Sequence, residues 1–208
     1  MELNVYISPR HTLRDWNNSP TLGTKIDIFE ARVADWTLAV AQRLVDTDRA
    51  AGFATLAIVA SYFEMIIQYR DGAPGKGASK ATFQKGIAWV FPSLSMYGDH
   101  AAREIADAVY DEVRNGLYHD GATRSKVRIS NSFACPLAGV MRGHPKTITL
   151  GSSVEIAIPS TQDSVATVDV NPRQFVAALS NHFSSYLAEL RDPANDELRA
   201  NFERRFMA

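Results

Sequence analysis

The 208-residue chain contains one cysteine, and its charges nearly cancel. The single Cys135 cannot form an intrachain disulfide, so a reducing compartment is expected. A formal net charge of -1 excludes the broad basic surface of a protein that coats nucleic acid, but it allows a small phosphate site. The N-terminal residues MELNVYISPRH have neither a basic segment nor a continuous apolar stretch, and they predict no secretory signal. We therefore expect a cytoplasmic protein.

Common motifs of metal, nucleotide and serine-nucleophile sites are also missing. The five histidines lack the paired spacing of zinc sites, and there is no Gly-x-Ser-x-Gly elbow. The glycine-rich segment 71–80, DGAPGKGASK, is not a P-loop, because Gly77 follows Lys76 where Ser or Thr is required. We interpret it as a connection between helices, with Lys76 and Lys80 as candidate contacts to a phosphate. No metal and no cofactor is predicted.

One apolar run, residues 51–69, raises the question of a membrane span. Polar residues including Glu64 and Gln68 interrupt it, and no second such run exists, so a core helix explains it better than a span. A carboxylate at Glu64 costs several kcal/mol among apolar neighbours unless it is paired or protonated. Two interpretations stay open: Glu64 orients a catalytic Arg or His, or it reaches solvent or Arg70 near the helix end.

Apolar periodicity predicts a mainly α (α+β) fold in a single domain of residues 1–208. Four helices are expected. The first starts at Thr24, the second at Asp46 or Asp48, the third ends before Pro92, and the fourth starts at Asp99. Their apolar stripes predict core faces that run from Phe29 through Val33, Trp36 and Val40 to Leu44 in the first helix, from Ile105 to Leu117 in the fourth, and from Phe175 to Leu190 in the helix after Pro172. The apolar period changes to two after Gly121, which predicts short strands in an antiparallel meander. Asn171-Pro172 and Asp192-Pro193 are start signals for two last helices. The parts are an irregular arm at 1–22, a helical core at 24–121, a β insertion at 126–170 and C-terminal helices at 171–208.

The segment RNGLYHDG, residues 114–121, closes the fourth predicted helix and is the strongest candidate site. The helix dipole favours cations at the C-terminal end of a helix, and this alone is enough to explain Arg114 and His119. The segment also gathers four polar groups within a turn and a half, because Asn115 and His119 share one face and Arg114 and Tyr118 share the next. His119 titrates near neutral pH, so the patch combines a fixed charge with a proton donor or acceptor.

An Arg followed by a polar residue and, after four intervening positions, a His resembles the motif of the HEPN superfamily (higher eukaryote and prokaryote nucleotide-binding). Arg114, Asn115 and His119 match these positions. The resemblance covers about residues 24–121 and the C-terminal helices, and it leaves the strands at 126–170 unexplained. It implies a HEPN-like helical bundle with a small antiparallel β insertion before the C-terminal helices.

Many HEPN proteins are metal-independent endoribonucleases, often toxins or antiviral proteins, and others have lost activity. The resemblance implies that Arg114 binds phosphate, that His119 is the acid or base, and that Asn115 and Tyr118 position them, with Glu64 in support. One chain supplies one such His, so the acid and the base together imply a homodimer. The alternative is a non-catalytic module of the same fold that binds a nucleotide or a protein. A nucleotidyltransferase-type antitoxin is the partner implied by the family.

Overall fold

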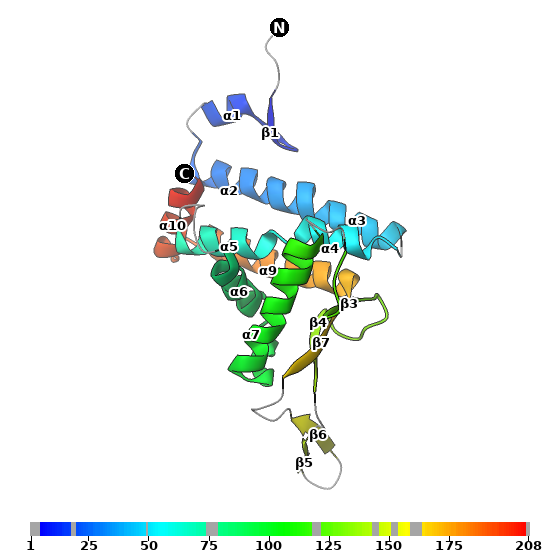
Figure 1. Ribbon diagram of the computed structural model, residues 1–208. Helices are drawn as coiled ribbons and strands as arrows, with labels where there is room; N and C mark the ends of the chain where they lie inside the picture. The colour runs from blue at the N-terminus through cyan, green and yellow to red at the C-terminus, as the bar shows by residue number, and fades with distance from the viewer. Residues whose placement is uncertain are drawn as a thin grey trace.

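The computed structural model describes residues 5–17, 20–48, 50–73, 79–117, 122–142, 146–150, 154–158 and 164–206, with the backbone alone for 146–150 and 154–158. This part of the chain is mainly helical, with the two sheets of the β insertion on one side of the helices and a small N-terminal hairpin on the opposite side (Figure 1). The fold class predicted from the sequence, mainly α with a minor β component, is confirmed at this level.

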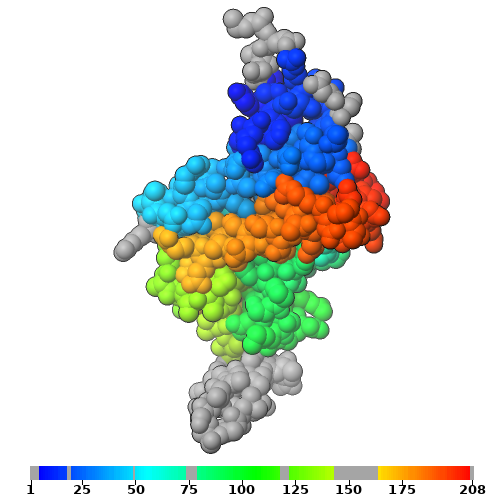
Figure 2. Space-filling model, turned by 180° about the vertical axis from the view of Figure 1, so that it is seen from behind, coloured from blue at the N-terminus to red at the C-terminus, as the bar shows by residue number. Residues whose placement is uncertain are grey.

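The helical core is built from two long helical rods and several shorter helices. One rod comprises α2 (Leu22–Glu30), the π-helical η1 (Ala31–Leu38) and α3 (Ala39–Thr47). The other is α9 (Pro172–Arg191), which lies alongside the first rod on the face that Figure 2 shows. The shorter helices are α4 (Gly52–Val59), α5 (Tyr62–Asp71), α6 (Ser79–Val90), α7 (Asp99–Ala108) and α10 (Asp196–Phe206), together with the π-helical η3 (Val109–Gly116) and the 3-10 helix η2 (Pro92–Tyr97). Phenylalanines from five helices fill the centre, and they are Phe29, Phe63, Phe83, Phe175, Phe183 and Phe202.

Most of the residues that apolar periodicity predicted to be buried are buried, but the prediction was wrong in part of the first rod. The predicted stripes of α7–η3 and α9 are buried, from Ile105 to Leu117 and from Phe175 to Leu190. In the first rod, however, Trp36 is 48% exposed although its spacing placed it on the core face. The i→i+5 bonds of η1 widen the helical turn, so Leu38 and Val45 face the core after it.

Three of the predicted helix starts were misplaced, those of the first two helices and that of the last. The first helix begins at Leu22, because Thr21 is the N-cap and its Oγ1 accepts from the Thr24 amide at 3.2 Å. The second begins at Gly52, and Asp48 instead closes a tight turn by accepting from the Ala50 amide at 2.7 Å. The predicted end before Pro92 and start at Asp99 are confirmed.

The helix α9 begins as predicted, with Asn171 Oδ1 accepting from the Gln174 amide and Pro172 in the first turn. The last helix, however, begins at Asp196 and not after Asp192, because α9 continues to Arg191 and uses Asp192 as its C-cap.

The β insertion is not a meander. Its main sheet has the order β3-β7-β4, formed by Val127–Ile129, Val165–Val170 and Leu137–Met141. The last strand, β7, enters between the other two, so it is parallel to β3 and antiparallel to β4. A separate antiparallel pair is formed by β5 (Lys146–Leu150) and β6 (Val154–Ile158). The sequence pattern missed β4 altogether.

The N-terminal residues also have more regular structure than the predicted irregular arm. A short hairpin of β1 (Tyr6–Ser8) and β2 (His11–Thr12) is followed by α1 (Leu13–Asn17). This unit is tied to the first rod, because Arg32 Nε donates to the carbonyl oxygen of Ile7 at 2.7 Å.

The helices α4 and α5 continue one another as Gly52–Asp71, the only described segment long and apolar enough to cross a membrane. Half of its most apolar stretch is buried inside the protein, which is the behaviour expected of a core helix. The close packing of α5 against α6 depends on Gly86, because a Cβ there would overlap the backbone of Phe63.

Candidate functional site

The structure places Arg114 and Asn115 in η3, the π-helical continuation of α7. Its wider turns are visible in the bond from the Leu117 amide to the Glu112 carbonyl oxygen, five residues back. Such turns are frequent at functional sites. Asn115 is half-buried next to Arg114. The other two residues of the motif, Tyr118 and His119, lie outside the described residues, as does Lys76.

Glu64 of α5 binds Arg114. The Arg114 Nε lies 3.0 Å from Glu64 Oε2, and the hydroxyl of Ser79, the first residue of α6, donates to Glu64 Oε1. The Glu64 side chain is 12% exposed and that of Arg114 is 30% exposed. The alternative partner, Arg70, binds Asp71 instead, at 2.9 Å. Of the two interpretations of Glu64, the geometry favours the one in which it orients an arginine.

The pair brings three distant segments together. Glu64 precedes Arg114 by 50 residues in the chain, and both lie next to the start of α6. A carboxylate fixed at Nε sets the plane of a guanidinium group, because the Nε–H direction lies in that plane. Arg114 is therefore oriented before any ligand arrives, and part of its side chain remains exposed for a ligand to contact.

Lys80 is the second residue of α6, and two carboxylates already compensate its charge. Its Nζ lies 3.1 Å from both Asp107 Oδ1 and Asp111 Oδ2, and 5.7 Å from the centre of the Tyr110 ring. Burial acts to lower the pKa of Lys80, but the hydrogen bonds and charges of the two carboxylates outweigh it and raise the pKa. Lys80 is thus a weaker phosphate contact than its position in the sequence suggested.

Two carboxylates that the sequence pattern did not single out attach the β insertion to the same helix. Glu112, 7% exposed, accepts from the backbone amides of Lys126 and Val127 at 3.0 and 2.8 Å. Glu104 accepts from the Val165 amide at 2.7 Å. The chain therefore leaves η3 at Leu117 and is held against η3 again at Lys126. The one signal in the sequence was the position of these acidic residues next to the apolar stripe of the helix.

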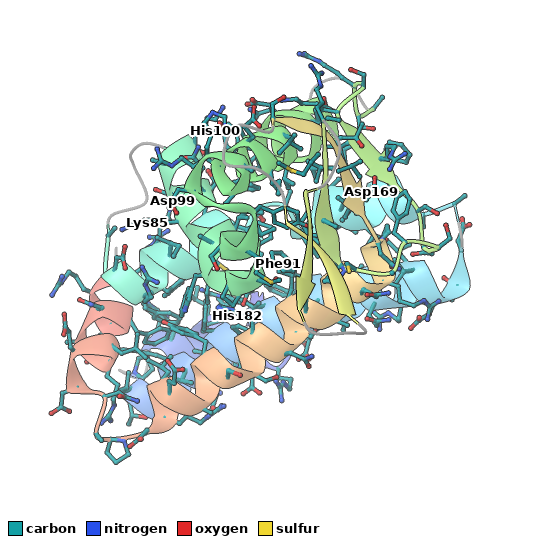
Figure 3. The ribbon with its side chains drawn as sticks, turned by 90° about the horizontal axis from the view of Figure 1, so that it is seen from below. Lys85, Phe91, Asp99, His100, Asp169 and His182 are labelled. Carbon is teal, nitrogen blue, oxygen red and sulfur yellow. The ribbon has the colours of Figure 1, made fainter. Side chains whose placement is uncertain are left out.

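The described histidines form no metal site, since no group of three metal-binding side chains occurs in this part of the chain. His100 lies at the outer end of α7, whereas His182 is a half-buried residue of α9 (Figure 3). His182 Nδ1 is 2.8 Å from the Tyr62 hydroxyl, and its ring centre is 4.4 Å from that of Trp89. Burial, assisted by the charge of Arg70, lowers the pKa of His182 to about 4. His182 is therefore a neutral packing residue at physiological pH.

Comparison with models of known families, with curated proteins and with solved structures yields no match to this chain. The functional argument accordingly depends on the residues of the motif and on the geometry around Arg114.

Proposed function

We propose that this chain is a HEPN-like, metal-independent endoribonuclease of the toxin or phage-defence type, acting in the cytoplasm as a homodimer. The observation that carries the proposal is the Glu64–Arg114 pair. An arginine held by a carboxylate that is 12% exposed is oriented in advance, and preorganised charge is what stabilises a phosphorane most effectively. The location of Arg114 in a π-helical segment directly before the proposed catalytic histidine supports the same conclusion.

The proposed reaction uses the ribose 2′-hydroxyl as nucleophile. A bond forms between O2′ and phosphorus, the bond from phosphorus to O5′ breaks, and the products are a 2′,3′-cyclic phosphate and a 5′-hydroxyl. His119 of one chain takes the 2′-hydroxyl proton, and His119 of the second chain gives a proton to the leaving O5′. Arg114 compensates the charge that develops on the non-bridging oxygens. Asn115 and Tyr118 position these two groups, and Lys80 is left with a minor electrostatic role.

The decisive experiment is RNA cleavage in EDTA by the wild-type protein, His119→Ala and Arg114→Ala. Arg43→Ala is a matched control, because Arg43 is an exposed arginine on α3, on a different helix from the motif. We expect wild type and Arg43→Ala to cleave, and both motif variants to lose at least about a hundredfold in rate. Equal cleavage by all four proteins would mean a contaminating nuclease and would refute the proposal. A monomeric mass in solution would refute the composite two-chain site.

A second candidate function is a non-catalytic module of the same fold that binds a nucleotide or a partner such as a nucleotidyltransferase-type antitoxin. It is favoured by the net charge of -1 and by the pairing of Lys80 with Asp107 and Asp111, which leave little positive field for RNA. One measurement distinguishes the two functions. A non-catalytic module is expected to bind a fluorescent ATP analogue or a short RNA without cleaving it, and Arg114→Ala is expected to weaken that binding.

A further inference from the structure

A cleft of about 360 Å³ opens between α6, η2 and α7, at the opposite end of the α6–α7 pair from Arg114. Its floor is formed by the buried side chains of Ile87, Phe91 and Leu94. Figure 3 shows Phe91 beneath α7, with Asp99 at the outer end of that helix. The cleft exists because the walls carry short side chains where the two helices approach each other, and these are Ala88, Ala102 and Ala106.

Two residues of opposite charge, Asp99 and Arg103, stand at the rim of the cleft on α7. They are four residues apart and therefore share one face of the helix. Both are exposed, and neither makes an ion pair or side-chain hydrogen bond with any residue that the structure describes.

The other acidic residues of α7 and η3 are engaged, which makes Asp99 exceptional. Asp107 and Asp111 bind Lys80, while Glu104 and Glu112 accept from backbone amides of the β insertion. The rim of the cleft is thus the place on this long helix where a carboxylate and a guanidinium group both lack a charged partner among the described residues.

We propose that the cleft binds a small zwitterion with an apolar side chain, of the class of leucine, methionine and phenylalanine. The ammonium group pairs with Asp99, the carboxylate pairs with Arg103, and the apolar side chain enters the cleft over Ile87 and Phe91. Asp99 would repel a simple anion, and Arg103 would repel a simple cation. A zwitterion instead pairs with both side chains at once. The volume is at the lower end of the range for ligand sites, which suits a molecule of this size. The inference does not depend on the proposed nuclease activity.

Calorimetric titration of the full chain with L-leucine, L-methionine and L-phenylalanine tests the proposal. We expect saturable binding of at least one of them, together with a rise in melting temperature that follows ligand concentration. N-acetyl-leucine lacks the ammonium group, leucinamide lacks the carboxylate, and glycine lacks the apolar side chain. Each is expected to bind at least about tenfold more weakly than leucine, because each loses one charge-assisted or apolar contact. No binding of the three amino acids at about 10 mM overturns the proposal, and so does equal binding of the blocked analogues.

The variants Asp99→Asn and Arg103→Gln keep the shape of the rim and remove one charge each, and both are expected to weaken leucine binding at least about tenfold. Ala102→Leu fills the cleft and is expected to abolish binding. Arg43→Gln on α3 is the matched control and should bind as wild type does. Unchanged affinity in both rim variants overturns the assignment, and because these residues are exposed, that result holds even if Ala102→Leu fails to fold.

Discussion

Removing Arg114 alone is expected to destabilise the fold more than removing Arg114 and Glu64 together. Arg114→Met would leave the Glu64 carboxylate, 12% exposed, without its cationic partner and with Ser79 as its remaining hydrogen-bond donor. The double variant Glu64→Leu/Arg114→Met removes both charges, so neither is left without a partner. Its apolar side chains are compatible with the surroundings, because the residues before and after Glu64, Phe63 and Met65, belong to the apolar core or pack against it.

The magnitude follows from the exposure of the two side chains. Breaking a fully buried ion pair by removing one partner costs about 3–5 kcal/mol. Water reaches Arg114, which is 30% exposed, so we expect about 2 kcal/mol for Arg114→Met. Replacing both charges by apolar groups of similar volume is often nearly neutral, so the double variant should lie within about 1 kcal/mol of wild type.

The assay is a double-mutant cycle of urea unfolding on wild type, both single variants and the double variant, followed by circular dichroism. The m-value should stay constant, so that differences in midpoint report stability. A coupling free energy of about 1–2 kcal/mol is expected between two residues in direct contact. Strict additivity, within about 0.3 kcal/mol, would show that the pair does not form and would remove the observation that carries the proposed function.

Three further predictions concern packing and pH. Glu112→Gln should cost about 2 kcal/mol in urea unfolding, because an amide group turns a donor toward one of the two backbone amides that the carboxylate accepts from. Gly86→Ala should cost about 3 kcal/mol or more, because the added Cβ overlaps the backbone of Phe63. His182 has a pKa of about 4 against an ordinary 6.5, so it contributes full stability above pH 6.5 and loses it as the pH falls toward 4. Its partial exposure limits this loss to about 1–2 kcal/mol, which His182→Gln should remove from the pH profile.

Each of these three predictions has its own control. Glu203→Gln tests a half-exposed acidic residue bound to Lys25 on the surface and should cost less than about 1 kcal/mol. Gly23→Ala places a Cβ no closer than 3.7 Å to its nearest neighbour and should not destabilise α2. A wild-type stability profile that falls no more steeply between pH 6.5 and 4 than that of His182→Gln would contradict the assignment of His182 as a half-buried neutral residue.

Local signals in the sequence predicted some of the helix boundaries correctly. Pro92 and the pair Asn171-Pro172 act within one turn of their own position, through a missing amide or a side chain that caps nearby amides. Asp99 acts through its negative charge in the first turn of α7. The stripe of α9 was equally clear, because a regular helix repeats its core face at a constant spacing. The same rule wrongly predicted that Trp36 is buried, because the π-helical bonds of η1 change the spacing. No residue near η1 signals that change in the sequence.

Contacts between residues far apart in the chain could not be predicted from the sequence. Alternation of apolar residues shows that a segment forms a strand, but it does not show its neighbours, so the parallel pairing of β7 with β3 could not be predicted. The same holds for the candidate site: the motif marks Arg114, whereas nothing near Glu64 in the sequence distinguishes Arg114 from Arg70 as its partner.

The sequence by itself therefore determined a mainly helical chain with an apolar central helix, a β insertion and a polar motif at the end of one helix. Tertiary structure alone decided that Glu64 meets Arg114, that Asp107 and Asp111 compensate Lys80, and that Glu112 returns the chain to η3. The physical reason is the distance along the chain over which each interaction acts. Capping and periodicity are properties of a few consecutive residues, whereas the partner of a buried charge is chosen by the packing of helices that are 15 to 50 residues apart in the chain.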